Sequence, residues 1–327
     1  MDRLRRKFMQ KSAMLGVAAL GGISMPNMLF AKGGIDLWSA PALISLVVAV
    51  AIKQGKAKDI MELRYKEWSN PDQLRAGFAS GEFVFGASPS NVGVNLYNRG
   101  IDVAMLNILT NGLNYIYAKD ESLNDLKDLE GKKVIVPFKN DLPHIVLQAL
   151  CKERNVDINK MKIEFVKTPP EAVMLFIAKD YDAVLAQEPM SSAMELMAMK
   201  NGKKVRRTID LNQIWSDTFK DCPKIPQAGL IVRRDFYEQN SNFFDIFHSD
   251  LKDALKWILN NQTQAANFGS KYLPTPEPAI LRAIPYGNFT VDRCKDISDN
   301  LDAFFDIIYE LNPNLIGGKK PPKKLYL

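Results

Sequence analysis

Apolar and polar positions from residue 35 onward follow two alternating patterns. Short apolar runs typical of strands are separated by longer stretches with the spacing of amphipathic helices. The first set has strand-like runs at 35–38, 60–65, 83–87 and 102–109, and helical stretches at 41–54, 70–81 and 88–100. Strands that alternate with helices at this spacing predict parallel sheets with helices on both faces.

The pattern then restarts. The second set has a helical turn and a strand within 122–137, helices at 141–155, 168–180 and 190–202, and strands at 163–167 and 181–189. An extended run at 227–237 leads into helices rich in Phe and Leu that continue to residue 327. The chain therefore contains two strand–helix sets, a return segment and a helical tail.

Capping residues mark several of the helix boundaries. Asn70 precedes a proline at the first helical position, and Gly81 follows as a stop signal. Thr168 stands three residues before Glu171, which is the spacing of a capping box. These local signals predict helix starts after Asn70 and Thr168.

The N-terminal stretch has the order of an export signal. Basic residues that include Arg5 and Arg6 come first, a run without charge covers 12–24, and the sequence LFA ends at Ala31. The uncharged run is too short to span a membrane, which takes about 20 apolar residues. RRKFMQK resembles the twin-arginine signal R-R-x-F-L-K, so we expect cleavage after Ala31 and export of the folded protein by the twin-arginine machinery.

Charge gives little support for a nucleic-acid partner. The chain has a formal net charge of +6, but residues 1–31 carry five of the 43 Lys and Arg and one of the 37 Asp and Glu. The rest of the chain therefore has a net charge of about +2, and it has no dense basic stripe interleaved with aromatic residues. We expect the basic runs at 202–207 and 317–327 to be solvated surface.

The three cysteines are too few and too widely spaced for a disulfide framework or a metal motif. We expect Cys151, Cys222 and Cys294 to be buried thiols, with one disulfide as the alternative, and we expect no metal and no cofactor. The longest apolar stretch after the signal, 40–52, is shorter than a membrane span and predicts a buried helix.

Several short motifs together resemble the solute-binding proteins of ABC importers, in the nitrate, sulfonate, taurine and thiamine-precursor branch. In sequence order, members of this branch have a strand with the motif D-L-K-G-K-x-I-x-V, a helix, a second helix with the motif P-x-E-A, and then the short motifs D-A and E-P. The counterparts here lie at 129–136, 170–172, 182–183 and 188–189, and the segments at 229–247 and 252–268 resemble the return strand and C-terminal helices. The usual G-x-F stretch after the first helix is absent, which leaves the ligand subclass open.

The resemblance implies an α/β, two-lobed periplasmic binding protein fold of type 2 with a ligand cleft between the lobes. The implied division is a signal peptide at 1–31, the first part of lobe one at 32–118, lobe two at 119–222, and a return to lobe one at 223–327. It also implies a monomeric, non-enzymatic periplasmic protein that delivers a small-molecule ligand to an ABC permease and its ATPase.

Candidate ligand contacts follow from the rule that ligands bind beyond the carboxyl ends of strands in open α/β sheets, near helix N-termini. The candidates are Trp38, Ser39, Ser88, Ser90, Asn91, Asn107, Phe138, Asn140, His144, Glu188 and Gln227. Each has a structural alternative. Ser88 and Ser90 suit helix caps, Trp38 suits a core position, and His144 lies at an otherwise apolar helix start.

The candidate residues favour a small organic acid or sulfonate with a polar substituent. Helix N-termini favour an oxyanion, an aromatic wall favours an organic body, and Glu188 tolerates an amine or another donor. Two other functions stay open. One is an enzyme on the same fold, of the thiamine-pyrimidine synthase or menaquinone-pathway type, although the cysteine-rich motif of the synthases is missing. The other is a ligand-sensing partner of a membrane receptor.

Overall fold

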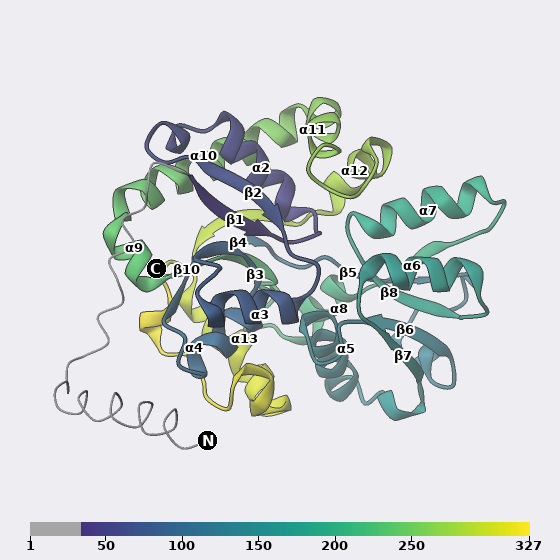
Figure 1. The fold of residues 1–327 in the computed structure, drawn as a ribbon. Helices are drawn as coiled ribbons and strands as arrows, with labels where there is room; N and C mark the ends of the chain where they lie inside the picture. The colour runs from purple at the N-terminus through teal and green to yellow at the C-terminus, as the bar shows by residue number, and fades with distance from the viewer. Residues whose placement is uncertain (1–33) are drawn as a thin grey trace, which may run out of the picture. The chain divides into compact units, whose positions relative to one another are not determined.

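Two β-sheets organise residues 34–327, the part of the chain that the computed structural model describes (Figure 1). In spatial order, the first sheet contains β11 (Phe289–Arg293), β4 (Val103–Thr110), β10 (Ala228–Arg233), β3 (Phe85–Pro89), β1 (Ile35–Ser39) and β2 (Leu63–Glu67). The second contains β7 (Lys162–Val166), β6 (Lys133–Pro137), β8 (Ala183–Gln187), β5 (Asn114–Ala118) and β9 (Arg206–Asp210). We use lobe one for residues 34–110 and 228–327, and lobe two for residues 114–218.

Both sheets are mixed, whereas the sequence pattern predicted parallel sheets. β1 pairs in parallel with β2 and β3, and β6 pairs in parallel with β7 and β8. β10 is antiparallel to β3 and β4, and β5 is antiparallel to β8 and β9. β5 and β10 each follow directly after a crossover between the lobes. Each therefore starts at the edge of its sheet where the neighbouring strands end, and runs antiparallel to them.

Helices cover both faces of the first sheet, as the alternating pattern predicted. Figure 1 shows α2 and α10 on one face, with α3 and α4 on the other. The lobe-one helices are α2 (Ile44–Gln54), α3 (Pro71–Ser80), α4 (Ser90–Asn98), α9 (Arg234–Gln239), α10 (Ser241–Asn260), α11 (Gln262–Gly269), α12 (Glu277–Ala283) and α13 (Ser298–Leu311). The lobe-two helices are α5 (Leu142–Glu153), α6 (Pro169–Ala178), α7 (Met190–Lys200) and α8 (Leu211–Thr218). Short 3-10 helices are η1 (Ala57–Asp59), η2 (Leu126–Leu129), η3 (Ile158–Lys160), η4 (Ile284–Tyr286), η5 (Pro313–Ile316) and η6 (Lys323–Leu325).

The apolar stretch at 40–52 forms a core helix, as predicted, although α2 begins at Ile44 rather than at Pro41. Every residue of α2 from Ile44 to Ile52 is buried, and α2 packs against α10. Among the described helices, none combines the length and the apolar character that crossing a membrane requires. Removal of apolar surface from water contributes about 25 cal/mol per Å², and this burial is the main source of stability for α2.

The predicted capping residues stand at the helix starts. The Asn70 side chain accepts hydrogen bonds from the backbone N–H groups of Asp72 and Gln73, and Gly81 ends α3 with φ at 82°. The Thr168 hydroxyl accepts from the backbone N–H of Glu171 at 3.4 Å. In return, the Glu171 carboxylate accepts from the backbone N–H of Lys167, one residue before the cap, at 3.0 Å.

The chain passes between the lobes at 111–113 and again at 219–227. The predicted first boundary, after residue 118, would leave β5 in lobe one, but β5 pairs with β8 and β9 in the second sheet. Its register places the start of lobe two at Asn114. The predicted signal peptide at 1–31 lies outside the described residues.

The basic residues of the two runs are exposed, as expected, with the exception of Arg207. The segment at 206–210 forms β9, and the C-terminal tail lies against lobe one through buried Leu325 and Tyr326. The Tyr326 hydroxyl donates to Asp302 at 3.1 Å. The three cysteines are buried and unpaired, as expected, and burial raises the pKa of the Cys151 and Cys222 thiols to about 12.

Candidate functional site

Two contiguous cavities lie where elements of both lobes meet. The outer groove has a volume of about 610 Å³ and the inner cavity about 50 Å³, and they share Pro71, Phe138 and Asp141. The outer groove is lined by Asn70, Pro71, Asp72, Arg75, Asn95, Arg99, Phe138, Lys139, Asn140, Asp141, Phe165, Val166, Lys167, Asn312, Asn314 and Leu315. The inner cavity is lined by Ala40, Pro41, Ala42, Ile44, Trp68, Pro71, Pro89, Leu113, Phe138, Asp141, Leu142, Pro143, Pro169, Gln187, Gln227 and Ala228. The outer space has the size of a small-molecule pocket, which is typically about 300–1,000 Å³.

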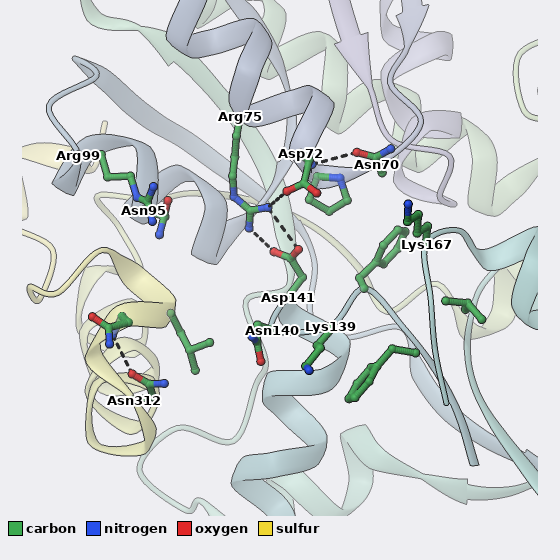
Figure 2. Close-up of a pocket in the computed structure, with 16 residues that line it drawn as sticks. Asn70, Asp72, Arg75, Asn95, Arg99, Lys139, Asn140, Asp141, Lys167 and Asn312 are labelled. Carbon is green, nitrogen blue, oxygen red and sulfur yellow. Dashed lines mark hydrogen bonds and ion pairs between the residues drawn. The ribbon is translucent and has the colours of Figure 1, made fainter. Parts of the chain in front are cut away.

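An ion pair between the lobes stands at the border of the two cavities (Figure 2). Arg75, on α3 of lobe one, binds both carboxylate oxygens of Asp141, which precedes α5 of lobe two. Arg75 also pairs with Asp72 at 3.1 Å, and the Asn91 amide donates to Asp141 Oδ1 at 3.4 Å. Burial raises the pKa of the Asp141 carboxyl, and the hydrogen bonds and charge of Arg75 oppose that rise.

A second buried ion pair lies within lobe two. Arg207 Nη2 lies 2.6 Å from Glu188 Oε1, and the Glu188 side chain has no exposed surface. Arg207 Nε also donates to the Tyr117 hydroxyl at 2.9 Å. Its Cζ atom lies 4.2 Å from the ring centre of Tyr115 and 3.5 Å from that of Tyr286, the last residue of η4 in lobe one. Burial raises the pKa of Glu188 despite the nearby guanidinium.

Further contacts join the lobes. The backbone N–H of Leu43, just before α2, donates to the carbonyl of Glu188 at 3.3 Å. Arg282 on α12 pairs with Glu195 on α7 at 2.6 Å. With the Arg75–Asp141 pair, these contacts join the lobes at several places.

An amide cluster ties the two crossovers together. The Gln227 carbonyl oxygen accepts from the Leu113 backbone N–H at 3.0 Å and from the Asn114 amide at 2.8 Å. The Asn114 carbonyl oxygen accepts from the Gln187 amide at 3.0 Å. Gln227 and Gln187 both line the inner cavity, so the segments about which the lobes would hinge are also part of its wall.

Several of the predicted residues lie at these cavities. Phe138 lines both, Asn140 lines the outer groove, and Gln227 lines the inner one. Ser90 and Asn91 are buried at the start of α4, beside Pro89, and neither the Ser90 hydroxyl nor the Asn91 carbonyl oxygen has a hydrogen-bond partner among the described residues. Their place as ligand contacts remains a prediction.

The other predicted residues make structural contacts and line neither cavity. Trp38 stacks on Phe83 with ring centres 4.0 Å apart, and Ser39 hydrogen-bonds Ser45 at 2.6 Å. The side-chain contacts of the remaining four are with protein groups: Ser88 with Pro89, Asn107 with Leu230, His144 with Asn140, and Glu188 with Arg207.

These contacts have simple physical causes. Asn107 lies inside β4, where its side-chain oxygen accepts from a backbone N–H of the neighbouring strand β10. His144 accepts from the Asn140 backbone N–H at 3.1 Å, and burial together with Lys139 lowers its pKa to about 4. A neutral imidazole in that position completes the start of α5. Trp38, Ser39, Asn107 and His144 line neither cavity, and their role as ligand contacts remains a prediction.

Sequence reasoning missed the charged residues of the site. Arg75 lies within α3 and Asp141 directly precedes α5, at positions that look ordinary in sequence, and Arg207 comes from the run expected to be solvated surface. Only the alternation within 206–210 could have indicated Arg207: the Arg207 side chain is 17% exposed, whereas that of Arg206 is 54% exposed.

Solved structures share this architecture. An ABC transporter protein from Parabacteroides distasonis aligns at a TM-score of 0.72 and 16% identity, over 88% of this chain and 96% of that one. The periplasmic aliphatic sulphonate binding protein SsuA from Escherichia coli aligns at a TM-score of 0.69 and 16% identity, over 91% of this chain and 92% of that one. A Candida albicans gene product with the generic periplasmic binding protein fold aligns at a TM-score of 0.57 and 12% identity, over 88% of this chain and 96% of that one. The chain therefore has the two-lobed α/β fold of periplasmic binding proteins that its sequence predicted.

A comparison with curated protein sequences gives no match. The model of the NMT1/THI5-like family, in contrast, matches residues 56–265, which run from just after α2 in lobe one, through all of lobe two, into α11. The matched segment covers most of the chain and includes both crossovers. The protein therefore belongs to the NMT1/THI5-like family.

Proposed function

We propose that this protein is an exported solute-binding protein that captures a small polar or anionic organic molecule and delivers it to an ABC import system. The observation that carries the proposal is the pair of contiguous cavities walled by both lobes, with the amide cluster of the crossovers forming part of the inner wall. Closure of two lobes around a ligand is the usual hinge motion of binding proteins with this architecture. The transporter-related and sulphonate-binding neighbours support the same role.

The proposed setting follows from the same role. An ABC permease and its ATPase would be the partners, the periplasm would be the location, and a monomer would suffice because the cavity walls come from a single chain. We propose binding without turnover. Ligand recovered from the denatured complex should have the mass of the ligand that was added, and a changed mass would favour the enzyme alternative.

A thermal-shift screen of the chain from Lys32 onward tests the binding role. The panel contains sulfonates, nitrate, bicarbonate, amino acids and pyrimidine precursors. A ligand present at 100 times its dissociation constant should add about 2.7 kcal/mol to the free energy of unfolding, which such a screen detects readily.

Ligand binding should also compact the protein, because a ligand held by both lobes favours the closed arrangement over open ones. Small-angle scattering should give a smaller radius of gyration at saturating ligand than without it. A compound from the same panel that gives no thermal shift is the control. An identical scattering profile with and without a tightly bound ligand would count against hinge closure.

Export by the twin-arginine pathway is a separate proposal, supported by Arg5 and Arg6 ahead of the short uncharged run. Replacement of both arginines with lysine preserves the charge but should leave the precursor in the cytoplasm, which fractionation of the cells would detect. The matched control replaces Lys7 and Lys11 with arginine and should export normally. Periplasmic accumulation of the double-lysine variant would refute the twin-arginine route and leave general export open.

A further inference from the structure

The outer groove has an excess of positive charge. Its lining contains four cations, Arg75, Arg99, Lys139 and Lys167, and two carboxylates, Asp72 and Asp141. Both carboxylates pair with Arg75, so the acidic groups of the lining are already engaged with one cation. The lining therefore has a formal charge of +2, concentrated in the three remaining cations.

Those three cations have no carboxylate partner within the described part of the chain. The Lys139 ammonium lies 5.1 Å from the ring centre of Phe165. The neighbouring carboxylate of Glu171 accepts from the backbone N–H of Lys167. An excess of one sign of charge in a concave surface focuses the field and raises the local concentration of the opposite ion.

The cations come from different lobes. Arg99 follows α4 in lobe one, whereas Lys139 and Lys167 follow β6 and β7 in lobe two. Figure 2 shows Arg99 on one side of the Arg75–Asp141 pair and Lys167 on the other. A ligand with a single charge could neutralise only one of these sides, and a ligand with two charged ends could contact both lobes at once.

We propose that the outer groove binds an organic anion with at least two negative charges, such as a dicarboxylate, one charge facing Arg99 and the other facing Lys139 and Lys167. This inference rests on the proposed solute-binding function and specifies its ligand class. Phe138 and Phe165 provide apolar surface for the carbon body, and Asn140 and Asn312 add amide groups to the lining.

Matched pairs of acids test the proposal on the chain from Lys32 onward. The probes are succinate with butyrate, glutarate with valerate, and benzene-1,4-dicarboxylate with benzoate, each pair differing by one carboxylate. Affinities are measured by calorimetry at constant ionic strength, because exposed charges are screened by salt. At least one dianion should bind about fivefold or more tightly than its monoanion partner, as one additional exposed ion pair allows.

Variants locate the effect. Arg99→Gln and Lys139→Gln should each lower the affinity for the dianion by roughly two- to fivefold. The double variant should bind the dianion no more tightly than the monoanion. Lys256→Gln, at an exposed position of α10 outside the groove, is the matched control and should leave both affinities unchanged.

The outcomes separate this inference from the proposed function. If an uncharged or singly charged compound from the wider screen binds and compacts the protein while no dianion outperforms its partner, the ligand class is wrong and the binding role stands. Equal dianion affinity in the parent and the double variant would also refute the groove as the site. Failure of every compound to bind or compact the protein would overturn both.

Discussion

Replacement of Arg207 with alanine should lower the free energy of unfolding by about 3–5 kcal/mol, because it leaves the buried carboxylate of Glu188 without its charge partner. This loss of stability should exceed the loss caused by breaking an exposed ion pair, since the Glu188 side chain has no exposed surface and water cannot solvate its charge. Arg207 also stacks against Tyr115 and Tyr286, and that packing would be lost with it. Chemical denaturation of parent and variant measures the difference.

The neighbouring arginine provides a matched control. Arg206 pairs with Glu121 at 3.5 Å, and both side chains are more than half exposed. Arg206→Ala should therefore cost at most about 1 kcal/mol. The double variant Glu188→Gln with Arg207→Met removes both buried charges and should recover much of the stability lost in Arg207→Ala. Equal losses of unfolding free energy in Arg207→Ala and Arg206→Ala would refute a special role for the buried pair.

The Arg207→Ala defect should depend on pH in a defined direction. Burial already raises the pKa of Glu188 above its ordinary value of 4.5, and loss of the guanidinium removes a group that opposes the rise. A carboxyl whose folded pKa is raised binds its proton more tightly in the folded state than in the unfolded state, so its contribution to stability declines as pH rises through the folded pKa. The defect should be largest above that raised pKa and shrink as the pH falls toward 4.5.

Features governed by neighbouring residues could be predicted from the sequence. Asn70 and Thr168 cap helices because the groups that they bind lie two or three residues away, and α2 is a core helix because residues 44–52 are apolar apart from Ser45. The mixed sheets could not be predicted in this way. The direction of β5 and β10 depends on the edge from which the chain enters each sheet, which is a property of the crossovers rather than of the strand residues.

The site was less predictable for a related reason. Asp141 has the position of a helix cap, yet its side chain makes no capping hydrogen bond and instead binds Arg75, 66 residues earlier. Polar residues at helix starts were treated as ligand contacts, and His144 proved to complete its own helix start. The basic run that contains Arg207 was expected to be solvated surface, yet Arg207 pairs with the fully buried side chain of Glu188. A pattern of residue types does not reveal a partner that only the tertiary fold brings close.

The ion pair between the lobes should affect closure rather than the stability of either lobe. The Arg75 and Asp141 side chains are 25% and 10% exposed while they bridge the lobes, and separation of the lobes would return both to water. Loss of Arg75 therefore penalises the closed state by about 1.5–3 kcal/mol, the contribution of a hydrogen bond to a charged group, and leaves the open state nearly unchanged. Because a ligand can bind fully only to the closed state, its apparent affinity should fall by the same free energy, which is roughly ten- to 150-fold.

Arg75→Ala tests this expectation when calorimetry of the ligand found in the screen is combined with chemical denaturation. Ligand affinity should fall by the predicted factor while the free energy of unfolding changes by less than about 1 kcal/mol. Arg64→Ala is the matched control, since Arg64 pairs with Asp36 within lobe one at 2.6 Å and should leave the affinity unchanged. Addition of Asp141→Asn to the Arg75 variant removes the uncompensated carboxylate and should restore part of the affinity even though no cation returns, a recovery that a direct contact between Arg75 and the ligand would not give. Equal losses of affinity and of unfolding free energy in Arg75→Ala would identify the pair as a structural element of the whole fold and refute its role in closure.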